Sequence, residues 1–144
     1  MALKSRLKIT EWNGEALTTK GRRIVQDYAR ALSVQFQKEI RTEQWPWPST
    51  TRRKNGSTAG STRDIVDTGV FAKSQRYRTN QLKSGVAITF NWYVDYAGFI
   101  RYGTGSSYPG RDWITKGLTA LPFKDFFAAN WKAGPVRATR RKAK

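Results

Sequence analysis

A stripe of hydrophobic residues with helical spacing runs through the first third of the chain. Residues three, four or seven positions apart lie on one face of an α-helix, which can pack against the rest of the protein. The stripe consists of Leu17, Ile24, Tyr28, Leu32, Phe36 and Ile40. It predicts a long amphipathic helix from Glu15 to about Glu43, which ends before the run Trp45 to Pro48 because the residue before a proline avoids helical backbone. Gly21 is the weakest position of this helix, since glycine costs about 1 kcal/mol relative to alanine.

Alternating hydrophobic and polar residues predict strands on both sides of this helix. Residues 3–12 alternate roughly and fit a short strand or an arm. Residues 86–92 alternate most clearly, so we expect a half-buried strand whose hydrophobic face belongs to the core. That face comprises Val86, Ile88, Phe90 and Trp92. Residues 76–79 fit another strand. A turn at residues 80–85 would join it to the strand at residues 86–92.

The last third of the chain predicts two further helices. Asp112 can cap a helix that continues through Lys116 or beyond, because a carboxylate accepts hydrogen bonds from the free N–H groups of a first turn. Residues 123–131 fit a second amphipathic helix, which Gly134 and Pro135 are expected to end. These elements predict an α+β fold in which a long N-terminal helix packs on a small antiparallel β-sheet, with a C-terminal helix.

Two polar, basic segments interrupt these patterns. Residues 49–63 contain no large hydrophobic residue, so we expect a flexible loop that cannot offset its ordering entropy by burial. Residues 136–144 carry five positive charges and no acid, which predicts a flexible basic tail. We therefore expect a single domain over residues 1–135 that contains the loop. The basic residues expected to contact a partner or DNA are Arg52, Arg53, Lys54, Arg63, Arg137, Arg140, Arg141 and Lys142.

The net charge is strongly positive, with 27 Lys and Arg residues against 10 Asp and Glu residues, giving +17. This charge predicts attraction to nucleic acid, an anionic membrane or an acidic protein surface, without selecting one of them. If the basic segments contact phosphates, affinity should fall with salt with a log–log slope of about −0.9 per contact. Alternatively, both segments are only solvated and aid solubility. No helix-turn-helix, zinc-finger or RNA-recognition signature is present, so we expect no sequence-specific base recognition.

The composition excludes several classes of enzyme. The chain has no histidine and no cysteine, which rules out Ser-His-Asp triads, Cys-His pairs, histidine-based zinc sites and disulfides. Asp64 and Asp67 are close in sequence, but a two-metal nuclease needs several converging acids, and these two fit turn and cap positions better. Gly103, Thr104 and Gly105 lack the following Gly-Lys-Ser/Thr of a nucleotide-binding loop. We expect no enzymatic activity, no metal or cofactor, and no small-molecule substrate.

The chain also lacks the sequence features of a membrane protein. No hydrophobic run reaches the ~18 residues needed to span a bilayer. The residues that follow Met1 lack the hydrophobic segment of a signal peptide. We therefore expect a soluble protein without a membrane partner, made in a cytoplasm.

The run Trp45-Pro46-Trp47-Pro48 allows two interpretations. Its prolines restrict the backbone toward an extended form. The two indoles could dock on a partner, because tryptophan is favoured as an interface anchor. They could equally pack over the protein's own sheet, and internal packing is the interpretation we favour. Both tryptophans remain candidates for a subunit interface.

Three segments between Val66 and Leu118 resemble a known family in their order and spacing. Residues 67–74, with the sequence Asp-Thr-Gly-Val-Phe-Ala-Lys-Ser, resemble an element that precedes a β-hairpin in that family. Residues 96–104 resemble its tyrosine–alanine segment ending in aromatic-Gly-Thr, and residues 108–114 resemble its proline–aromatic turn before the C-terminal helix. The family comprises the head–tail joining (neck) and tail-completion proteins of tailed bacteriophages, including lambdoid minor tail proteins.

The resemblance covers residues 12–131 and implies an α+β virion structural protein rather than an enzyme. Such proteins form a ring, usually of six subunits, at the top of the tail and help to join it to the DNA-filled head. The partners implied are further copies of the chain, adjoining neck, connector and tail proteins, and genomic DNA in the lumen. The implied location is the virion, after synthesis in the cytoplasm of the bacterial host. Asp112 departs from the family pattern, which has a second proline there.

A ring needs contacts between subunits, for which exposed aromatic residues are the natural candidates. The residues expected at the subunit interface are Trp45, Trp47, Tyr96, Tyr102, Tyr108 and Trp113. The competing interpretation of the chain is a small basic nucleic-acid-binding module without catalytic activity.

Overall fold

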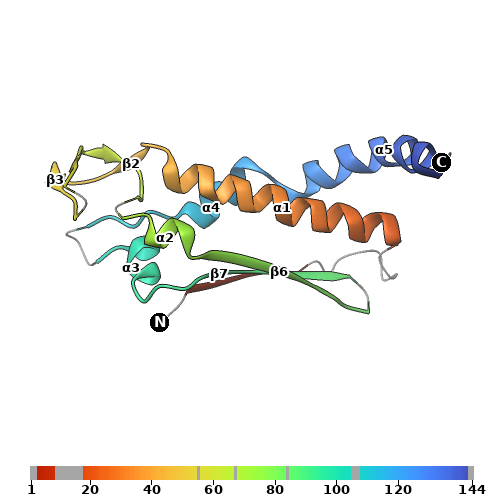
Figure 1. The fold of residues 1–144 in the computed structure, drawn as a ribbon, viewed down its shortest axis with the longest axis horizontal. Helices are drawn as coiled ribbons and strands as arrows, with labels where there is room; N and C mark the ends of the chain where they lie inside the picture. The colour runs from red at the N-terminus through yellow and green to blue at the C-terminus, as the bar shows by residue number, and fades with distance from the viewer. Residues whose placement is uncertain are drawn as a thin grey trace.

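Helix α1 (Thr19–Arg41) is the longest element and lies along one face of an antiparallel sheet (Figure 1). The computed structural model describes residues 3–8, 18–54, 56–66, 68–83, 85–104 and 108–142. The helix begins after Thr18, whose hydroxyl oxygen accepts a hydrogen bond from the N–H of Gly21 at 3.1 Å. The predicted start at Glu15 and the first stripe residue Leu17 lie outside the described residues. The rest of the predicted stripe is confirmed, with Ile24, Tyr28, Leu32, Phe36 and Ile40 all buried.

The sheet has three antiparallel strands in the order β1-β7-β6. These are β1 (Leu3–Lys8), β6 (Gln75–Gln81) and β7 (Val86–Trp92). Val86, Ile88 and Phe90 belong to the core, as predicted. The prediction that their strand is half-buried is wrong, because all seven residues of β7 are buried. β7 is the central strand, so the short side chains on its outer face lie between two flanking strands; these residues are Ala87, Thr89 and Asn91.

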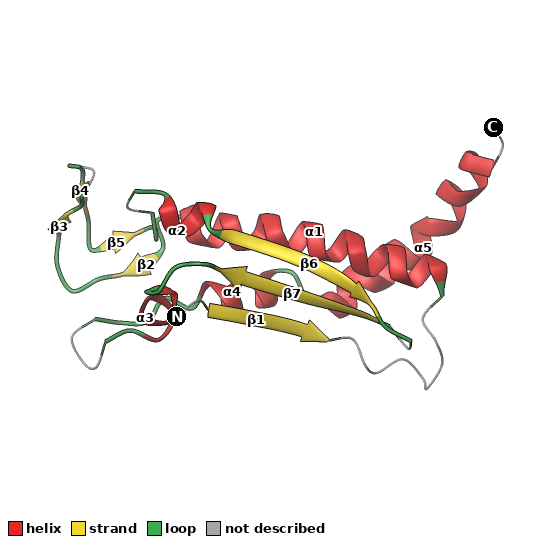
Figure 2. Ribbon diagram, turned by 60° about the horizontal axis from the view of Figure 1, so that its bottom comes forward, coloured by secondary structure: helices red, strands yellow, loops and turns green. Residues whose placement is uncertain are grey.

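The longer helices all lie on the same side of the sheet, which gives two layers (Figures 1 and 2). Helices α4 (Trp113–Ala120) and α5 (Phe123–Lys142) pack against α1. The core between the layers is aromatic, with the rings of Trp92 and Trp113 5.1 Å apart and those of Phe36 and Phe90 4.9 Å apart. No element that the structure describes covers the other face of the sheet. The fold is α+β, with the long helix, small sheet and C-terminal helix that the sequence predicted.

Two short antiparallel ribbons occupy the segment that was predicted to be a flexible loop. β2 (Trp45–Pro46) pairs with β5 (Thr62–Arg63), and β3 (Thr51–Arg52) pairs with β4 (Thr58–Ala59). The prediction considered only hydrophobic burial, of which this segment has little. Hydrogen bonds to a buried arginine, described below, order it instead.

Helix α5 is longer than the predicted C-terminal helix. It continues through Gly134 and Pro135 to Lys142, so residues 136–142 are helical and not the flexible tail that was predicted. A proline inside a helix removes its own N–H donor and strains the turn before it, but helical backbone can continue on both sides. The first half of α5 is held against α1 by aromatic contacts, with the ring of Tyr28 5.1 Å from that of Phe123 and 5.3 Å from that of Phe126.

Helices α2 (Val70–Lys73) and α3 (Ala97–Tyr102) lie beside the ribbons at one end of the molecule (Figures 1 and 2). Gly103 follows α3 with a φ of +80°, and a side chain there would run into the carbonyl oxygen of Tyr108. Only glycine allows this close approach of two backbone segments. We call this part of the protein the ribbon end; it comprises residues 44–54, 56–66, 68–73, 96–104 and 108–112.

Candidate functional site

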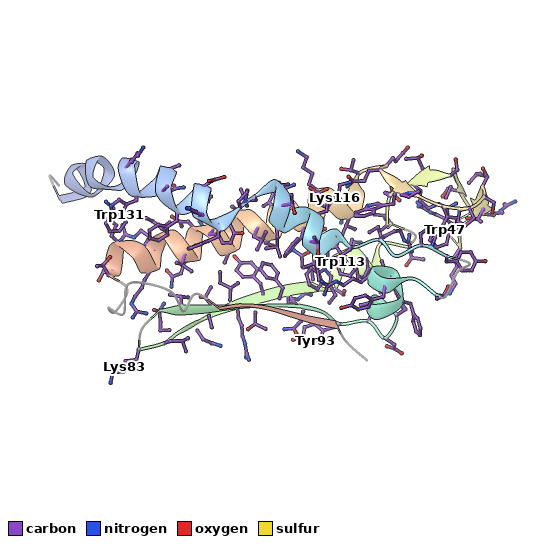
Figure 3. The ribbon with its side chains drawn as sticks, turned by 180° about the vertical axis from the view of Figure 1, so that it is seen from behind. Trp47, Lys83, Tyr93, Trp113, Lys116 and Trp131 are labelled. Carbon is purple, nitrogen blue, oxygen red and sulfur yellow. The ribbon has the colours of Figure 1, made fainter. Side chains whose placement is uncertain are left out.

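Trp47 lies at the centre of a stack of aromatic and arginine side chains at the ribbon end (Figure 3). Its ring stacks on Tyr108, with centroids 5.0 Å apart and an interplanar angle of 17°. The guanidinium carbons of Arg111 and Arg63 lie 4.5 and 5.0 Å from the centre of the Trp47 ring. Each cation–π contact of this kind contributes about 0.5–1 kcal/mol at an exposed site. The stack therefore holds two arginines and an exposed tyrosine in a defined arrangement.

Arg63 is buried and joins the two ribbons. Its Nε donates to the carbonyl oxygen of Gly60 at 2.9 Å, and its Nη1 donates to the hydroxyl of Thr51 at 2.8 Å. Its Nη2 donates to the carbonyl oxygens of Ser49 at 2.9 Å and Ala59 at 3.1 Å. A buried charge is tolerated when its donors are satisfied in this way. The prediction that Arg63 contacts DNA or a partner is therefore corrected, because its donors are used within the fold.

A cleft of about 580 Å³ opens beside this stack, between the ribbons and helices α2 and α3. Its walls are partly basic and partly hydrophobic. The lining residues that set its character are Arg53, Arg63, Arg111, Asp64, Phe71 and Ile100. Asp64 neutralises only one of these cations, since its Oδ1 lies 2.8 Å from Nη2 of Arg53. The cleft thus carries more positive than negative charge.

The electrostatics of Arg111 reflect this excess of positive charge. Burial, together with the charges of Arg63 and Arg53, lowers the pKa of Arg111 to about 10, although Asp64 opposes the shift. Arg111 still carries its charge at neutral pH. Its Nε is buried and has no hydrogen-bond partner in the part of the chain that the structure describes. An anionic group entering the cleft would reduce this repulsion, so the cleft is suited to a carboxylate or a phosphate.

Asp112 fixes the turn that carries Arg111. Its carboxylate accepts hydrogen bonds from the N–H and the hydroxyl of Thr115 at 3.1 and 2.7 Å, and it pairs with Nε of Arg101 at 3.1 Å. Burial alone would raise the pKa of Asp112, but the hydrogen bonds from Thr115 and the charge of Arg101 outweigh burial and lower it. The predicted cap is confirmed, because α4 starts at Trp113. Gly110 lets this turn pack directly on the backbone of Arg101.

Exposed hydrophobic side chains are concentrated near α3. Tyr96, Phe99 and Tyr102 follow one another at intervals of three residues, which places them on neighbouring positions of one helix face. Phe99 is 65% exposed and Tyr102 is 70% exposed. We call the exposed hydrophobic residues of this region the α3 surface; they are Val70, Tyr93, Tyr96, Phe99, Tyr102 and Tyr108. A cluster of this kind is typical of a protein interaction site.

The structure places three of the predicted interface residues at the molecular surface and two in the core. Tyr96, Tyr102 and Tyr108 belong to the α3 surface. Trp113 is 0% exposed, so the prediction that it contacts a neighbouring subunit is wrong. Trp45 is 7% exposed and donates from its indole N–H to the carbonyl oxygen of Glu39 at 2.8 Å, so it is also a core residue. Both indoles are buried because the inner faces of α4 and β2 turn them toward the hydrophobic core.

The remaining predicted residues differ in their placement. Trp47 is partly exposed in the stack, and Arg53 is held by Asp64. Arg52 and Lys54 are exposed on or beside β3. The backbone of α5 carries the remaining four predicted contacts, whose side chains lie outside the described part: Arg137, Arg140, Arg141 and Lys142.

Sequence reasoning missed Arg111 and Phe99. Both lie in the glycine-rich and aromatic segments that the resemblance singled out, but neither was considered as a site residue. Phe99 could have been found from its spacing, since it lies midway between Tyr96 and Tyr102. Nothing in the sequence places Arg111 beside Arg63, because the two lie 48 positions apart in the chain.

The described residues contain no group of three or more acidic, histidine or cysteine side chains that could hold a metal ion. Asp64 acts as a turn residue, as predicted, because its Oδ1 also accepts from the N–H of Val66 at 3.0 Å; Asp67 lies outside the described residues. Within the described ranges, none of the helices combines the length and hydrophobicity needed to cross a membrane. Comparisons of the chain with models of protein families, with curated proteins and with solved structures find no match.

Proposed function

We propose that this chain is a structural protein of a tailed bacteriophage virion, which forms a ring at the neck and joins the tail to the DNA-filled head. The observation that carries the proposal is the row of exposed aromatic side chains on α3, next to the stack centred on Trp47. Tyrosine, tryptophan and arginine are the residues that most often anchor protein interfaces. Here they gather at one end of the molecule, although the core has aromatic residues of its own.

The order of the elements supports the same proposal. The resemblance implies a long helix, a β-hairpin, a tyrosine–alanine segment, a proline–aromatic turn and a C-terminal helix, and the chain has α1, the β6-β7 hairpin, α3 over the tyrosine–alanine segment, and then α4 and α5 in that order. Only the order of the helices and strands agrees with what the resemblance implies. The function proposed for the chain rests on the α3 surface.

A closed ring requires two different surfaces on each subunit, because its interfaces are heterologous. The α3 surface would supply one of them. The basic cleft would receive an acidic group from an adjoining neck or connector protein, since its positive charge is only partly neutralised. A ring of six copies is the stoichiometry that the resemblance implies.

The test is a phage in which the gene for this chain is disrupted. We expect full heads and separate tails, and we expect joined particles again when the wild-type chain is supplied. A Phe99→Ser/Tyr102→Ser variant should fail to restore joining. A Val34→Ser variant should restore it, because Val34 is 66% exposed on α1 but lies outside the α3 surface. Normal joined particles without the protein would contradict the proposal.

A second candidate function is binding of nucleic acid without catalysis, which the net charge of +17 favours. The two functions predict different behaviour in solution. A protein that stays monomeric at all concentrations and binds duplex DNA with a steep salt dependence would support nucleic-acid binding as the main function. Discrete oligomers would support the ring.

A further inference from the structure

The face of the sheet that points away from the helices is strongly basic. In an antiparallel pair, residues directly opposite each other share one face. On β7 the outer row is Ala87, Thr89 and Asn91, because Val86, Ile88, Phe90 and Trp92 face the core. The register places Asn80, Arg78 and Arg76 of β6 beside this row on one side, and Lys8, Arg6 and Lys4 of β1 beside it on the other. Five cationic residues therefore hold positions on this face, and none of its positions holds an acid.

The β6 row of this face is open to solvent, whereas the middle row on β7 is buried. Figures 1 and 2 show helices α1, α4 and α5 on the opposite side of the sheet and α3 at its end, with no described element across the middle of this face. Arg76 and Arg78 are exposed. Lys83, in the turn between β6 and β7, and Tyr93, just after β7, also point to the side away from the helices (Figure 3). The cationic row on β6 thus lies where a large ligand can reach it.

No described acid neutralises Arg76 or Arg78. Nη1 of Arg76 donates to the carbonyl oxygens of Lys73 and Gln75 at 2.7 and 2.8 Å, which anchors the guanidinium at the sheet edge without an acid. Among the described residues, neither Arg76 nor Arg78 forms an ion pair with a carboxylate. Backbone positions two residues apart on one strand are about 6.8 Å apart, and the backbones of β1 and β6 are about 10 Å apart across β7. A polyanion would relieve this repulsion along the whole face.

The composition of the face selects between classes of polyanion. A protein partner usually needs a hydrophobic interface core, and the outer-row positions of the three strands hold no large hydrophobic residue; the exposed Tyr93 lies just after β7, at the edge. Single-stranded nucleic acid is usually held by stacking on several aromatic rings, which the outer rows do not offer. The middle row is buried and includes two polar side chains, Thr89 and Asn91, and the Oγ1 of Thr89 has no hydrogen-bond partner among the described residues. Cationic side chains beside polar ones are sufficient to bind the phosphates of a duplex.

We propose that the outer face of the β1-β7-β6 sheet binds duplex nucleic acid through its phosphates, without regard to sequence. Arg76 and Arg78 are the central described contacts, the register positions on β1 extend the surface, and Tyr93 adds a hydroxyl donor at its edge. This site differs from the basic loop and tail expected from the sequence. It does not depend on the proposed ring, because a monomer can bind a duplex.

The test measures the affinity of the full chain for a 20-base-pair duplex of arbitrary sequence at several salt concentrations. The variant is Arg76→Gln/Arg78→Gln. The control is Arg23→Gln/Lys38→Gln, which removes the same charge from exposed positions of α1. We expect the variant to lower the magnitude of the log–log salt slope by about 1.8, or about 0.9 per lost phosphate contact. Its affinity near 0.1 M salt should fall by at least about tenfold, and the control should change little.

Three outcomes would overturn the proposal. Equal losses in the variant and the control would assign binding to net charge alone. A larger loss in Arg52→Gln/Lys54→Gln would assign it to the ribbon end. Equally tight binding of polyglutamate, with the same dependence on Arg76 and Arg78, would assign the face to an acidic protein. All four substituted residues in the variant and the control are exposed, so unchanged thermal unfolding of each protein is the expected check of folding.

Discussion

Arg63 donates hydrogen bonds to four oxygen atoms of the ribbon segment, from Ser49, Thr51, Ala59 and Gly60. Its planar guanidinium suits this arrangement, which the single ammonium group of a lysine cannot reproduce. We expect Arg63→Lys to leave several of these oxygens unsatisfied and to destabilise the ribbons by about 2 kcal/mol. Arg52→Lys, at an exposed position, should cost less than ~0.5 kcal/mol.

Hydrogen exchange measures the effect of Arg63→Lys locally. The N–H of Trp47, which donates to Ser61 at 2.7 Å, and that of Arg53, which donates to Ser57 at 2.8 Å, should exchange faster. Exchange in α1 and β7 should stay unchanged. Unaltered exchange of the ribbon N–H groups would show that another interaction orders them.

Gly117 is required by the packing of α4 on α1. A Cβ at this position would lie 2.5 Å from Cδ1 of Phe36, a ring that is itself buried against Phe90 and Trp92. We expect Gly117→Ala to lower the free energy of unfolding by about 1–3 kcal/mol, because overpacking outweighs the gain in helix propensity. Gly98→Ala in α3 is the matched control, since a Cβ there has no neighbour within 4 Å. Denaturant unfolding of the two variants measures this difference. Equal free energies of unfolding for Gly117→Ala and Gly98→Ala would contradict the prediction.

Tyr28 connects helix α1 with the turn between α4 and α5. Its hydroxyl donates to the carbonyl oxygen of Leu121 at 2.8 Å, and its ring meets Phe123 at 5.1 Å and Phe126 at 5.3 Å. Burial raises the pKa of Tyr28 from about 10 to about 12. The contact is therefore sensitive to alkaline pH.

The direction of this pH effect on folding stability depends on how the folded and the unfolded protein bind the Tyr28 proton. Between pH 10 and 12 the unfolded chain releases the phenol proton and the folded protein keeps it, so this contribution to stability is complete below pH 10 and is lost as pH rises to about 12. The loss is on the order of 3 kcal/mol. Stability measured against pH for the wild type and Tyr28→Phe should show the difference between them shrinking over this range. A constant difference would show that Tyr28 titrates normally in the folded protein.

Elements with a strong local pattern were predictable, and elements held by distant contacts were not. The stripe through Tyr28 and Phe36 located α1, and the alternation of Val86, Ile88 and Phe90 located β7, because these patterns repeat within a few residues. The ribbons were missed because Arg63 orders them through polar contacts with residues up to 14 positions away. Gly134 and Pro135 were expected to end a helix that continues past them.

The candidate sites were predictable in composition but not in position. The charge of +17 indicated a polyanion, and the aromatic segment from Tyr96 to Tyr108 indicated an interface. The basic face of the sheet depends on the pairing of residues 3–8 with residues 87–92, and this long-range register has no local signal. Whether Trp113 is buried or exposed also depends on long-range packing, because the sequence does not distinguish a buried from an exposed tryptophan.

In the whole molecule, the proposed activities lie on different surfaces, which adjoin at Tyr93. The α3 surface and the basic cleft lie at the ribbon end, whereas the outer cationic rows lie on the open face of the sheet. A subunit built in this way could contact its neighbours through one surface and nucleic acid through another. The central claim is that the α3 surface joins copies of this chain into a closed ring.

Native mass spectrometry of the purified chain over a range of concentrations tests this claim most directly. We expect one closed assembly, of six copies, at high concentration. Phe99→Ser/Tyr102→Ser should weaken assembly by about tenfold or more for each anchor removed, so that monomer replaces the ring. Val34→Ser should assemble as the wild type does. A wild-type protein that remains monomeric at every concentration, or a double variant that assembles normally, would contradict the account.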